Sequence, residues 1–223
     1  MPEQPAPLST HQTQRSPTSW VWLLLVLFLV MGAASLLLLS KQLGGISSSS
    51  LPDYGAVPDF QLTERSGVTL SRAELVGGVW VADFIFTRCQ GSCPLLSARM
   101  ATIQQMLQLA TTRPVRLVSF SVDPEWDTPE RLREYAARYR ADPQRWLFVT
   151  GPYQTMSDLI RGGFHLGLVK AEEATDAPPS EPIIHSDRLV LVDAAGHIRG
   201  YYQVTNQDGF NHLLQDLEVL RRE

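Results

Sequence analysis

Cysteine is scarce in this sequence, since only Cys89 and Cys93 occur among 223 residues. Two cysteines cannot form a framework of several disulfide bridges, and alone they cannot complete a four-coordinate structural zinc site. An excess of basic residues is also lacking, because 19 Lys and Arg stand against 23 Asp and Glu, a net charge of −4. A mildly acidic chain is a poor candidate for nucleic-acid binding, which needs a basic surface.

Apolar residues, by contrast, are present in ordinary proportion. They make up 44% of the chain, which is enough to fill a core and excludes wholesale disorder. A chain of 223 residues accommodates one domain of ordinary size together with a tail.

Charge is missing altogether from residues 20–39, WVWLLLVLFLVMGAASLLLL. A helix of this length rises about 30 Å, the thickness of the hydrocarbon core of a bilayer. A cleaved signal peptide has a shorter apolar region, usually about 7–15 residues, and a buried core helix would carry a polar stripe. We therefore expect residues 20–40 to form a single, uncleaved transmembrane helix.

The flanking residues divide the rest of the chain. The polar residues 1–19 lack the apolar area to fold and are expected to form a disordered tail. The Gly/Ser-rich residues 41–56 are expected to form a flexible tether, which leaves residues 57–223 as the folded domain. Charge does not set the orientation of the anchor, because Arg15 lies near one end and Lys41 near the other. The cysteine chemistry favours a domain outside the cytoplasm, on the periplasmic side of the cell (inner) membrane.

Strand and helix patterns alternate along the predicted domain. Runs of β-branched and aromatic residues predict strands at residues 59–62, 79–87, 116–121, 146–149, 188–193 and 197–202. Helical spacing and capping residues predict helices over residues 72–75, from Pro94, from Pro129, over 156–160 and around Phe210 to Leu220. This order favours an α/β fold, a thioredoxin-like sandwich whose central mixed sheet is flanked by helices.

Both cysteines come directly after one predicted strand and before a predicted helix. Reactive groups favour the carboxyl ends of parallel strands, and the amides at a helix start lower the pKa of a thiol. Three residues separate Cys89 from Cys93, one more than in the usual C-x-x-C redox pair. This wider loop could hold both sulfurs around one metal ion, or close into a disulfide when oxidised. Thiolates select Cu(I) among the metals that such a loop could bind.

Histidine is the candidate third ligand, because imidazole binds copper in both oxidation states. The five histidines are His11, His165, His185, His197 and His212. His185 differs from the others because it precedes an apolar strand and follows an acidic, proline-rich segment at residues 171–182. A histidine at the end of such a loop could move onto a metal and off again, so we expect residues 170–185 to be disordered or variable without metal. Periodicity alone leaves an ordinary structural role for His185 open.

Four segments together resemble the Sco/SenC family of copper chaperones. They are V-P-D-F at 57–60, C-x-x-x-C-P at 89–94, S-V-D-P with D-T-P across 121–129, and I-H-S at 184–186 ahead of a strand. The resemblance implies a thioredoxin-like fold in which Cys89, Cys93 and His185 bind one copper ion. It also implies delivery of copper to the binuclear copper site of cytochrome c oxidase, or reduction of the thiols there. The partner would be the copper-site subunit of that oxidase or another copper chaperone.

Three functions remain open on the sequence. The first is a membrane-anchored copper chaperone. The second is a thiol–disulfide reductase without obligatory metal, in which Cys89 attacks a disulfide and Cys93 resolves the mixed disulfide. The third is a peroxidase of the same fold. Asp123 is a further candidate as a hydrogen-bond acceptor near the cysteines; the alternative is a turn residue before Pro124.

Overall fold

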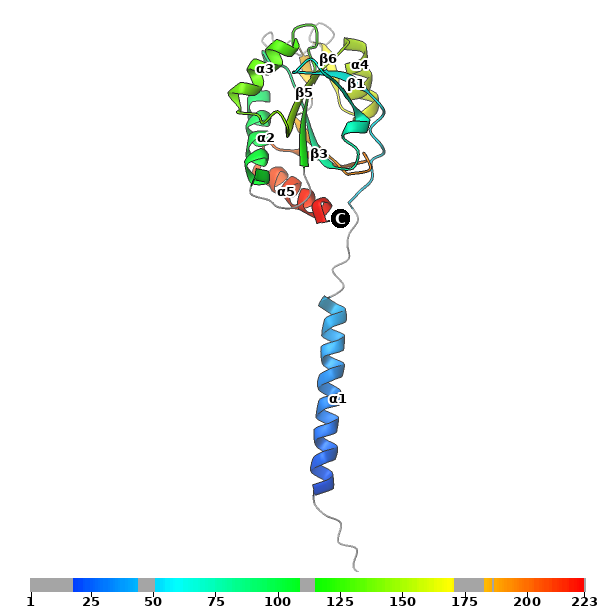
Figure 1. Ribbon diagram of the computed structural model, residues 1–223. Coiled ribbons are helices and arrows are strands. Elements are labelled where there is room, and N and C mark those ends of the chain that lie inside the picture. The colour runs from blue at the N-terminus through cyan, green and yellow to red at the C-terminus, as the bar shows by residue number, and fades with distance from the viewer. Residues whose placement is uncertain (1–17, 44–50, 109–114, 171–182, 186, 223) are drawn as a thin grey trace, which may run out of the picture. The chain divides into compact units, whose positions relative to one another are not determined.

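The computed structural model describes residues 18–43, 51–108, 115–170, 183–185 and 187–222 (Figure 1). The chain divides into two units, Met1–Ser50 and Leu51–Glu223, which we describe separately.

The first unit contains one helix, α1 (Thr18–Leu43), which includes the predicted apolar segment. The side chains of several α1 residues, 36–43 among them, lie outside the described set. Judged on the residues that are described, no helix combines the length and the apolarity needed to cross a membrane. Residues 1–17 of the predicted tail and residues 44–50 of the predicted tether also lie outside the described residues.

The second unit begins at Leu51, ahead of the predicted boundary at residue 57. The guanidinium group of Arg199 donates hydrogen bonds to the backbone carbonyls of Leu51, at 2.5 Å, and of Pro52, at 2.9 Å. Ala56 forms a β-bridge with His197. Residues 51–56, which we expected within the flexible tether, are therefore held against the domain by long-range contacts that composition does not reveal.

A seven-stranded mixed sheet forms the centre of this unit, in the order β2-β1-β5-β4-β3-β8-β9. Its strands are β1 (Gln61–Glu64), β2 (Thr69–Ser71), β3 (Val79–Ile85), β4 (Val115–Ser121), β5 (Trp146–Thr150), β8 (Arg188–Val192) and β9 (Ile198–Gln203). β3, β4 and β5 run parallel. β8 and β9 add the predicted antiparallel hairpin at one edge, and β1 and β2 add another at the opposite edge. The predicted mixed sheet is confirmed; β2, which we did not predict, is too short to show an alternating pattern.

Helices cover both sides of the sheet. They are η1 (Arg72–Glu74), α2 (Cys93–Gln108), α3 (Pro129–Arg138), α4 (Tyr153–Asp158), its π-helical extension η2 (Leu159–Gly163), and α5 (Gln207–Arg222). α2 packs against β3 and β4, α3 against β5, and α5 against β9 and β3. Figure 1 shows α4 on the other side of the sheet from α2 and α3. This layered arrangement is the thioredoxin-like sandwich expected from the order of the elements.

Aromatic side chains fill the core on the two sides of the sheet. One group, with ring centroids 5.0–6.4 Å apart, consists of Trp80, Phe84, Phe120 and Phe164. The other, with centroids 5.0–6.3 Å apart, consists of Tyr135, Tyr139, Trp146 and Phe148. Such close packing leaves few voids, so the parallel strands form a rigid platform for the loops at their carboxyl ends.

Two short strands lie outside the main sheet. β6 (Leu168–Lys170) pairs antiparallel with β7 (Ile183–His185), and His185 is opposite Leu168. Of residues 170–185, which we expected to be disordered or variable without metal, Lys170 and residues 183–185 lie in these paired strands. Residues 171–182 and the side chain of His185 lie outside the described residues.

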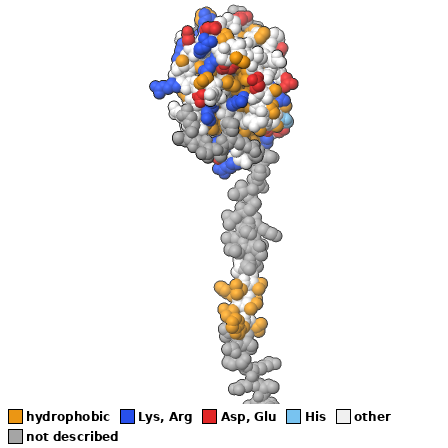
Figure 2. All heavy atoms as spheres, viewed as in Figure 1, with side chains coloured by type: hydrophobic (Ala, Val, Ile, Leu, Met, Phe, Trp, Pro, Cys, Tyr) orange, Lys and Arg blue, Asp and Glu red, His pale blue; other side chains and the backbone are white. Residues whose placement is uncertain are grey.

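The surface of the domain carries both signs of charge. On the face visible in Figure 2, Lys and Arg side chains alternate with Asp and Glu rather than gathering by sign. This mixture agrees with the small net charge of the whole chain.

Candidate dithiol and metal site

The loop that carries both cysteines joins the carboxyl end of β3 to the start of α2. Cys93 is the first residue of α2, and the carbonyl of Ser92 accepts a hydrogen bond from the Leu96 amide at 3.0 Å. The amide of Cys89 donates to the carbonyl of Phe86 at 3.1 Å. These bonds turn the chain tightly between strand and helix, so both cysteines lie where the sequence predicts them, at the carboxyl end of a parallel strand.

The two thiols differ in their surroundings. Cys93 is fully buried and Cys89 is partly exposed, and neither is in a disulfide. The hydrogen bond to the Cys89 side chain and burial raise the pKa of the Cys93 thiol well above its usual range, and the Asp83 carboxyl adds a smaller increase. A helix start favours a lower thiol pKa, but for Cys93 these opposing effects are larger. Cys93 therefore keeps its proton, and Cys89 is the sulfur that an incoming metal or disulfide meets first.

An ion pair ties the cysteine loop to the end of β4. Nε of Arg88 lies 2.7 Å from Oδ2 of Asp123, whose side chain is only 8% exposed. The Asp123 amide donates to the Ser121 hydroxyl at 3.1 Å, and its carbonyl accepts from the Asp127 amide at 2.8 Å. Asp123 is thus both an acceptor beside the residue that precedes Cys89 and a turn residue, so the two readings of the sequence are compatible.

Asp127 is a residue of this region whose role the sequence reading missed. Its fully buried carboxylate accepts hydrogen bonds from the Thr87 amide, at 3.2 Å, from the Thr87 hydroxyl, at 2.6 Å, and from the Ser121 hydroxyl, at 2.7 Å. Burial raises the pKa of Asp127 even though these hydrogen bonds lower it. The carboxylate fastens the end of β3, two residues before Cys89, to β4. The available signal was its place in the D-T-P segment at 127–129, which we used only for the family resemblance.

His185 is the predicted ligand whose side chain the structure does not describe. Its backbone lies in β7, opposite Leu168, and its side chain is outside the described residues. Within the described part of the chain, no three His, Cys, Asp or Glu side chains come close enough together to hold a metal ion. The structure brings together two of the predicted ligands, Cys89 and Cys93, and the third, His185, stays a prediction.

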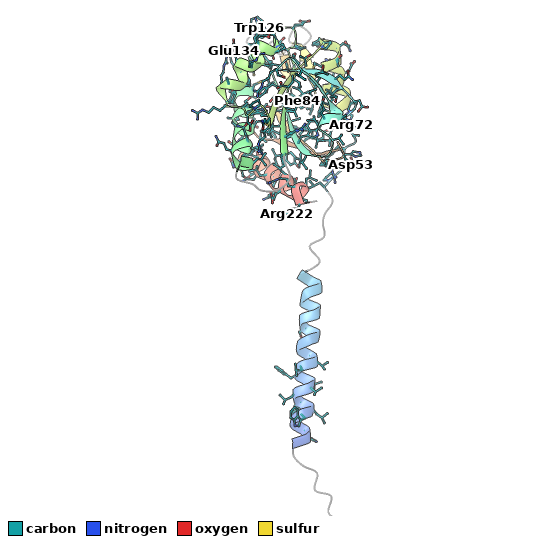
Figure 3. All side chains as sticks on the ribbon, in the orientation of Figure 1. Asp53, Arg72, Phe84, Trp126, Glu134 and Arg222 are labelled. Carbon is teal, nitrogen blue, oxygen red and sulfur yellow. The ribbon has the colours of Figure 1, made fainter. Side chains whose placement is uncertain are left out.

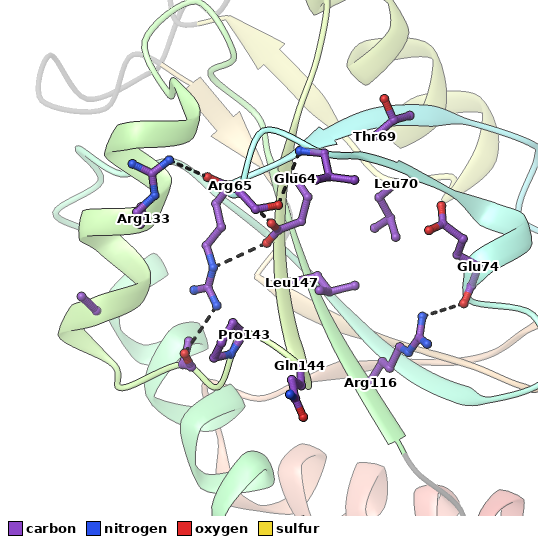
Figure 4. Close-up of a pocket in the computed structure, with 14 residues that line it drawn as sticks. Glu64, Arg65, Thr69, Leu70, Glu74, Arg116, Arg133, Pro143, Gln144 and Leu147 are labelled. Carbon is purple, nitrogen blue, oxygen red and sulfur yellow. Dashed lines mark hydrogen bonds and ion pairs between the residues drawn. The ribbon is translucent and has the colours of Figure 1, made fainter.

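A groove of about 660 Å³ lies between β1, β2, α3 and the start of β5 (Figure 4). In it the Arg65 guanidinium lies 3.5 Å from the Glu64 carboxylate, and Arg116 donates to the Glu74 carbonyl at 2.6 Å. Gln144 lies just before β5, and Arg116 lies near the start of β4. The groove therefore borders the amino-terminal ends of these parallel strands. Neither cysteine lines it. We place the chemistry at the cysteine loop, because thiols supply reactive groups that this groove does not contain.

A thioredoxin-like α/β sandwich with a hydrogen-bonded thiol pair between β3 and α2 defines the general class of this protein, the thioredoxin-like dithiol proteins. Its family follows from comparison with known proteins. The SCO1/SenC family model matches residues 50–219, and the chain belongs to the SCO1/SenC family. This confirms the resemblance drawn from the sequence segments.

Individual relatives agree with this assignment. The SCO1 protein homolog of Bacillus subtilis (strain 168) is 33% identical over 162 residues, covering 73% of this chain and 81% of that protein. The solved structure of BsSco, described as having a disulfide switch and as belonging to the Sco family of cytochrome c oxidase assembly proteins, is 30% identical, with a TM-score of 0.65 over 77% of this chain and 96% of that one. Arabidopsis thaliana ScoI, solved with copper bound, is 20% identical, with a TM-score of 0.63 over 76% and 100% of the two chains. The likeness to ScoI bears on the fold alone.

Proposed function

We propose that this protein is a copper chaperone that serves the assembly of the binuclear copper site of cytochrome c oxidase. The observation that carries the proposal is the contact between the Cys89 and Cys93 side chains at the end of a rigid strand, with Cys89 partly exposed. Two soft sulfur donors on one short loop suit Cu(I). The description of BsSco as an oxidase assembly protein supports the same process for this chain.

The residues of the loop would handle copper as cargo. Cys89 and Cys93 bind the ion through sulfur, and His185 supplies a nitrogen donor that favours retention of Cu(II). Because the pKa of Cys93 is raised, binding must release its proton, so the affinity falls as the pH falls. The Arg88–Asp123 ion pair holds the loop without using a sulfur. The receiving partner is the copper-site subunit of the oxidase or another copper chaperone.

The role of His185 gives a direct test. The reduced full-length protein, in detergent micelles, should bind one equivalent of copper, whether it is titrated with Cu(I) or with Cu(II). Absorbance and native mass spectrometry measure the binding. His185→Ala should weaken the affinity for Cu(II) by at least about 10-fold, the size expected for loss of a group that supports a metal site. His212→Ala is the matched control, since His212 is exposed on α5. Unchanged Cu(II) affinity and spectrum in His185→Ala would exclude the three-ligand site.

A thiol–disulfide reductase is the second candidate function. The asymmetry of the thiols supports it, because an accessible Cys89 can attack a disulfide, and the buried Cys93 beside it can resolve the mixed disulfide once its proton has passed to the leaving thiolate. The two functions separate on His185: a reductase retains activity in His185→Ala and loses it in either Cys→Ser variant, whereas a copper chaperone loses activity in all three.

We also propose that residues 20–39 anchor the protein in the membrane as a single span, with the cysteine domain outside the cytoplasm. The support is their lack of any charge over 20 residues. The full chain should remain in the membrane fraction after carbonate washing, and Leu25→Arg with Leu29→Arg should release it, since each arginine at mid-membrane costs about 2.5–3.5 kcal/mol. An impermeant maleimide should label Cys89 in intact spheroplasts; labelling only after lysis would contradict the orientation.

A further inference from the structure

A second hollow, of about 240 Å³, adjoins the cysteine loop. Its lining consists of Thr87, Arg88, Trp126, Arg131, Glu134 and Arg138. We call these six residues the Arg–Trp pocket. Thr87 and Arg88 immediately precede Cys89, so one wall of the pocket continues into the loop that carries the exposed thiol. Figure 3 shows Trp126 and Glu134 near the end of the domain that lies farthest from Arg222.

Trp126 is held in place although its side chain is 40% exposed. The guanidinium carbon of Arg131 lies 3.7 Å from the centroid of the indole ring, and that of Arg88 lies 5.1 Å from it. Arg131 also donates a hydrogen bond to the Trp126 carbonyl at 2.6 Å. An exposed tryptophan fixed by two cations loses little conformational freedom when a partner covers it, and such residues dominate protein interfaces.

The pocket is positively charged in a chain whose net charge is −4. It contains three arginines and one acid, Glu134. Arg88 is paired with Asp123, but neither Arg131 nor Arg138 forms an ion pair with a carboxylate anywhere in the described residues. Arg138 instead lies over the Tyr135 ring, with its guanidinium carbon 5.9 Å from the centroid. Two guanidinium groups beside the thiol loop are therefore available to an external anion.

We propose that the Arg–Trp pocket receives an acidic segment of the protein that exchanges copper or electrons with Cys89 and Cys93. This inference rests on the proposed function and adds to it the chemistry of the partner's contact surface. Carboxylates of the partner would pair with Arg131 and Arg138, while an apolar group beside them covers the part of Trp126 that is exposed. Because the pocket wall continues into the loop that carries Cys89, a partner segment bound there would place a cysteine sulfur of the partner next to the sulfur of Cys89. Charge at this surface chiefly raises the rate of association.

The test uses two synthetic peptides, each closed by a disulfide between two cysteines and flanked either by aspartates or by asparagines. In each reaction, the thiols of Cys89 and Cys93 become a disulfide, and the peptide disulfide takes up the two electrons and two protons. Each peptide is mixed with the reduced full-length protein in neutral detergent, and the amount of reduced peptide is measured over time after separation. We expect the aspartate peptide to react about 10-fold faster at low salt, with the difference lost at high salt.

Charge reversal in the pocket should reverse the preference for the aspartate peptide. Arg131→Glu with Arg138→Glu should make the aspartate peptide the slower of the two, and Trp126→Ala should slow both peptides without changing the net charge. Arg116→Glu with Arg222→Glu is the control, because it changes the net charge equally at exposed positions outside the pocket. Circular dichroism verifies folding of each variant.

Equal rates for the two peptides with the unmodified protein, including no detectable exchange with either, would overturn the inference. The same holds if the control pair alters the preference as much as the pocket pair does. Anionic vesicles that compete with the aspartate peptide only in the presence of the two arginines would assign the pocket to a phosphate headgroup instead. Failure of the proposed function would appear separately, as absence of copper binding by the unmodified protein. The Arg131→Glu, Arg138→Glu variant is expected to bind one equivalent of copper, as the unmodified protein does.

Discussion

Cys93→Ser should lower the affinity for Cu(I) by more than ~100-fold, because even partners behind metal ligands cost about 10–100-fold when removed. A serine hydroxyl is a hard donor that does not replace a soft thiolate. Cys89→Ser should have an effect of the same size, since both sulfurs lie on one loop and contact each other. Competition with a chromophoric Cu(I) chelator measures these affinities on the reduced full-length protein.

The interpretation is simple because the chain contains no other cysteine. Gln90→Ala is the matched control, since Gln90 is exposed in the same loop and carries no soft donor. It should leave the Cu(I) affinity within about 2-fold, as for surface changes away from any special contact. If either serine variant retained the affinity of the unmodified protein, the dithiol could not be the copper site.

Asp127→Ala should destabilise the domain by about 3 kcal/mol, because buried donors left without an acceptor cost about 1–3 kcal/mol each. The donors that lose their acceptor are the Thr87 amide, the Thr87 hydroxyl and the Ser121 hydroxyl. The free energy of unfolding, from urea denaturation monitored by tryptophan fluorescence, tests this. Asp158→Ala provides the control, since Asp158 is exposed and accepts a hydrogen bond from Gln154 one turn earlier in α4. A change in stability no larger than that of Asp158→Ala would contradict the role of Asp127.

The same residue carries a pH dependence of known sign. Burial raises the pKa of Asp127 in the folded state above the ordinary value of 3.8, so the folded state holds this proton more tightly than the unfolded state. The part of the stability that comes from this protonation is therefore fully present below pH 3.8 and is lost as the pH rises through the folded-state pKa. Asp127→Asn, which preserves one acceptor and cannot ionise, should remove that loss.

Short-range signals in the sequence predict much of this fold. The Thr128 hydroxyl accepts from the amide three residues later, at 3.4 Å, and Asn206 Oδ1 does the same at the start of α5, at 2.7 Å. Caps of this kind can be predicted from the sequence because a capping hydrogen bond spans only one turn. Pro94 lies in the first turn of α2, where its missing N–H has no cost. The position of the cysteines between β3 and α2 follows from the same local patterns.

Long-range contacts explain what the patterns missed. Arg88 and Asp123 are separated by 35 residues, and Thr87 and Asp127 by 40, so no local periodicity links either pair. β6 and β7 are three residues each, too short for an alternating pattern, and their pairing connects the two ends of a long segment. Leu51 and Pro52 are held to the domain because Arg199 reaches their carbonyls and Leu51 packs against the core.

The sequence by itself determined that two thiols stand at a strand–helix junction of an α/β domain, because both features depend on neighbours within a few residues. It also determined the family, through short segments whose order is visible in the chain. Only the tertiary structure decided how the thiols differ. The burial of Cys93, the Asp127 hydrogen bonds to Thr87 and the cationic pocket around Trp126 arise when β3, β4 and α3 come together, since desolvation and charge depend on what surrounds a group in space.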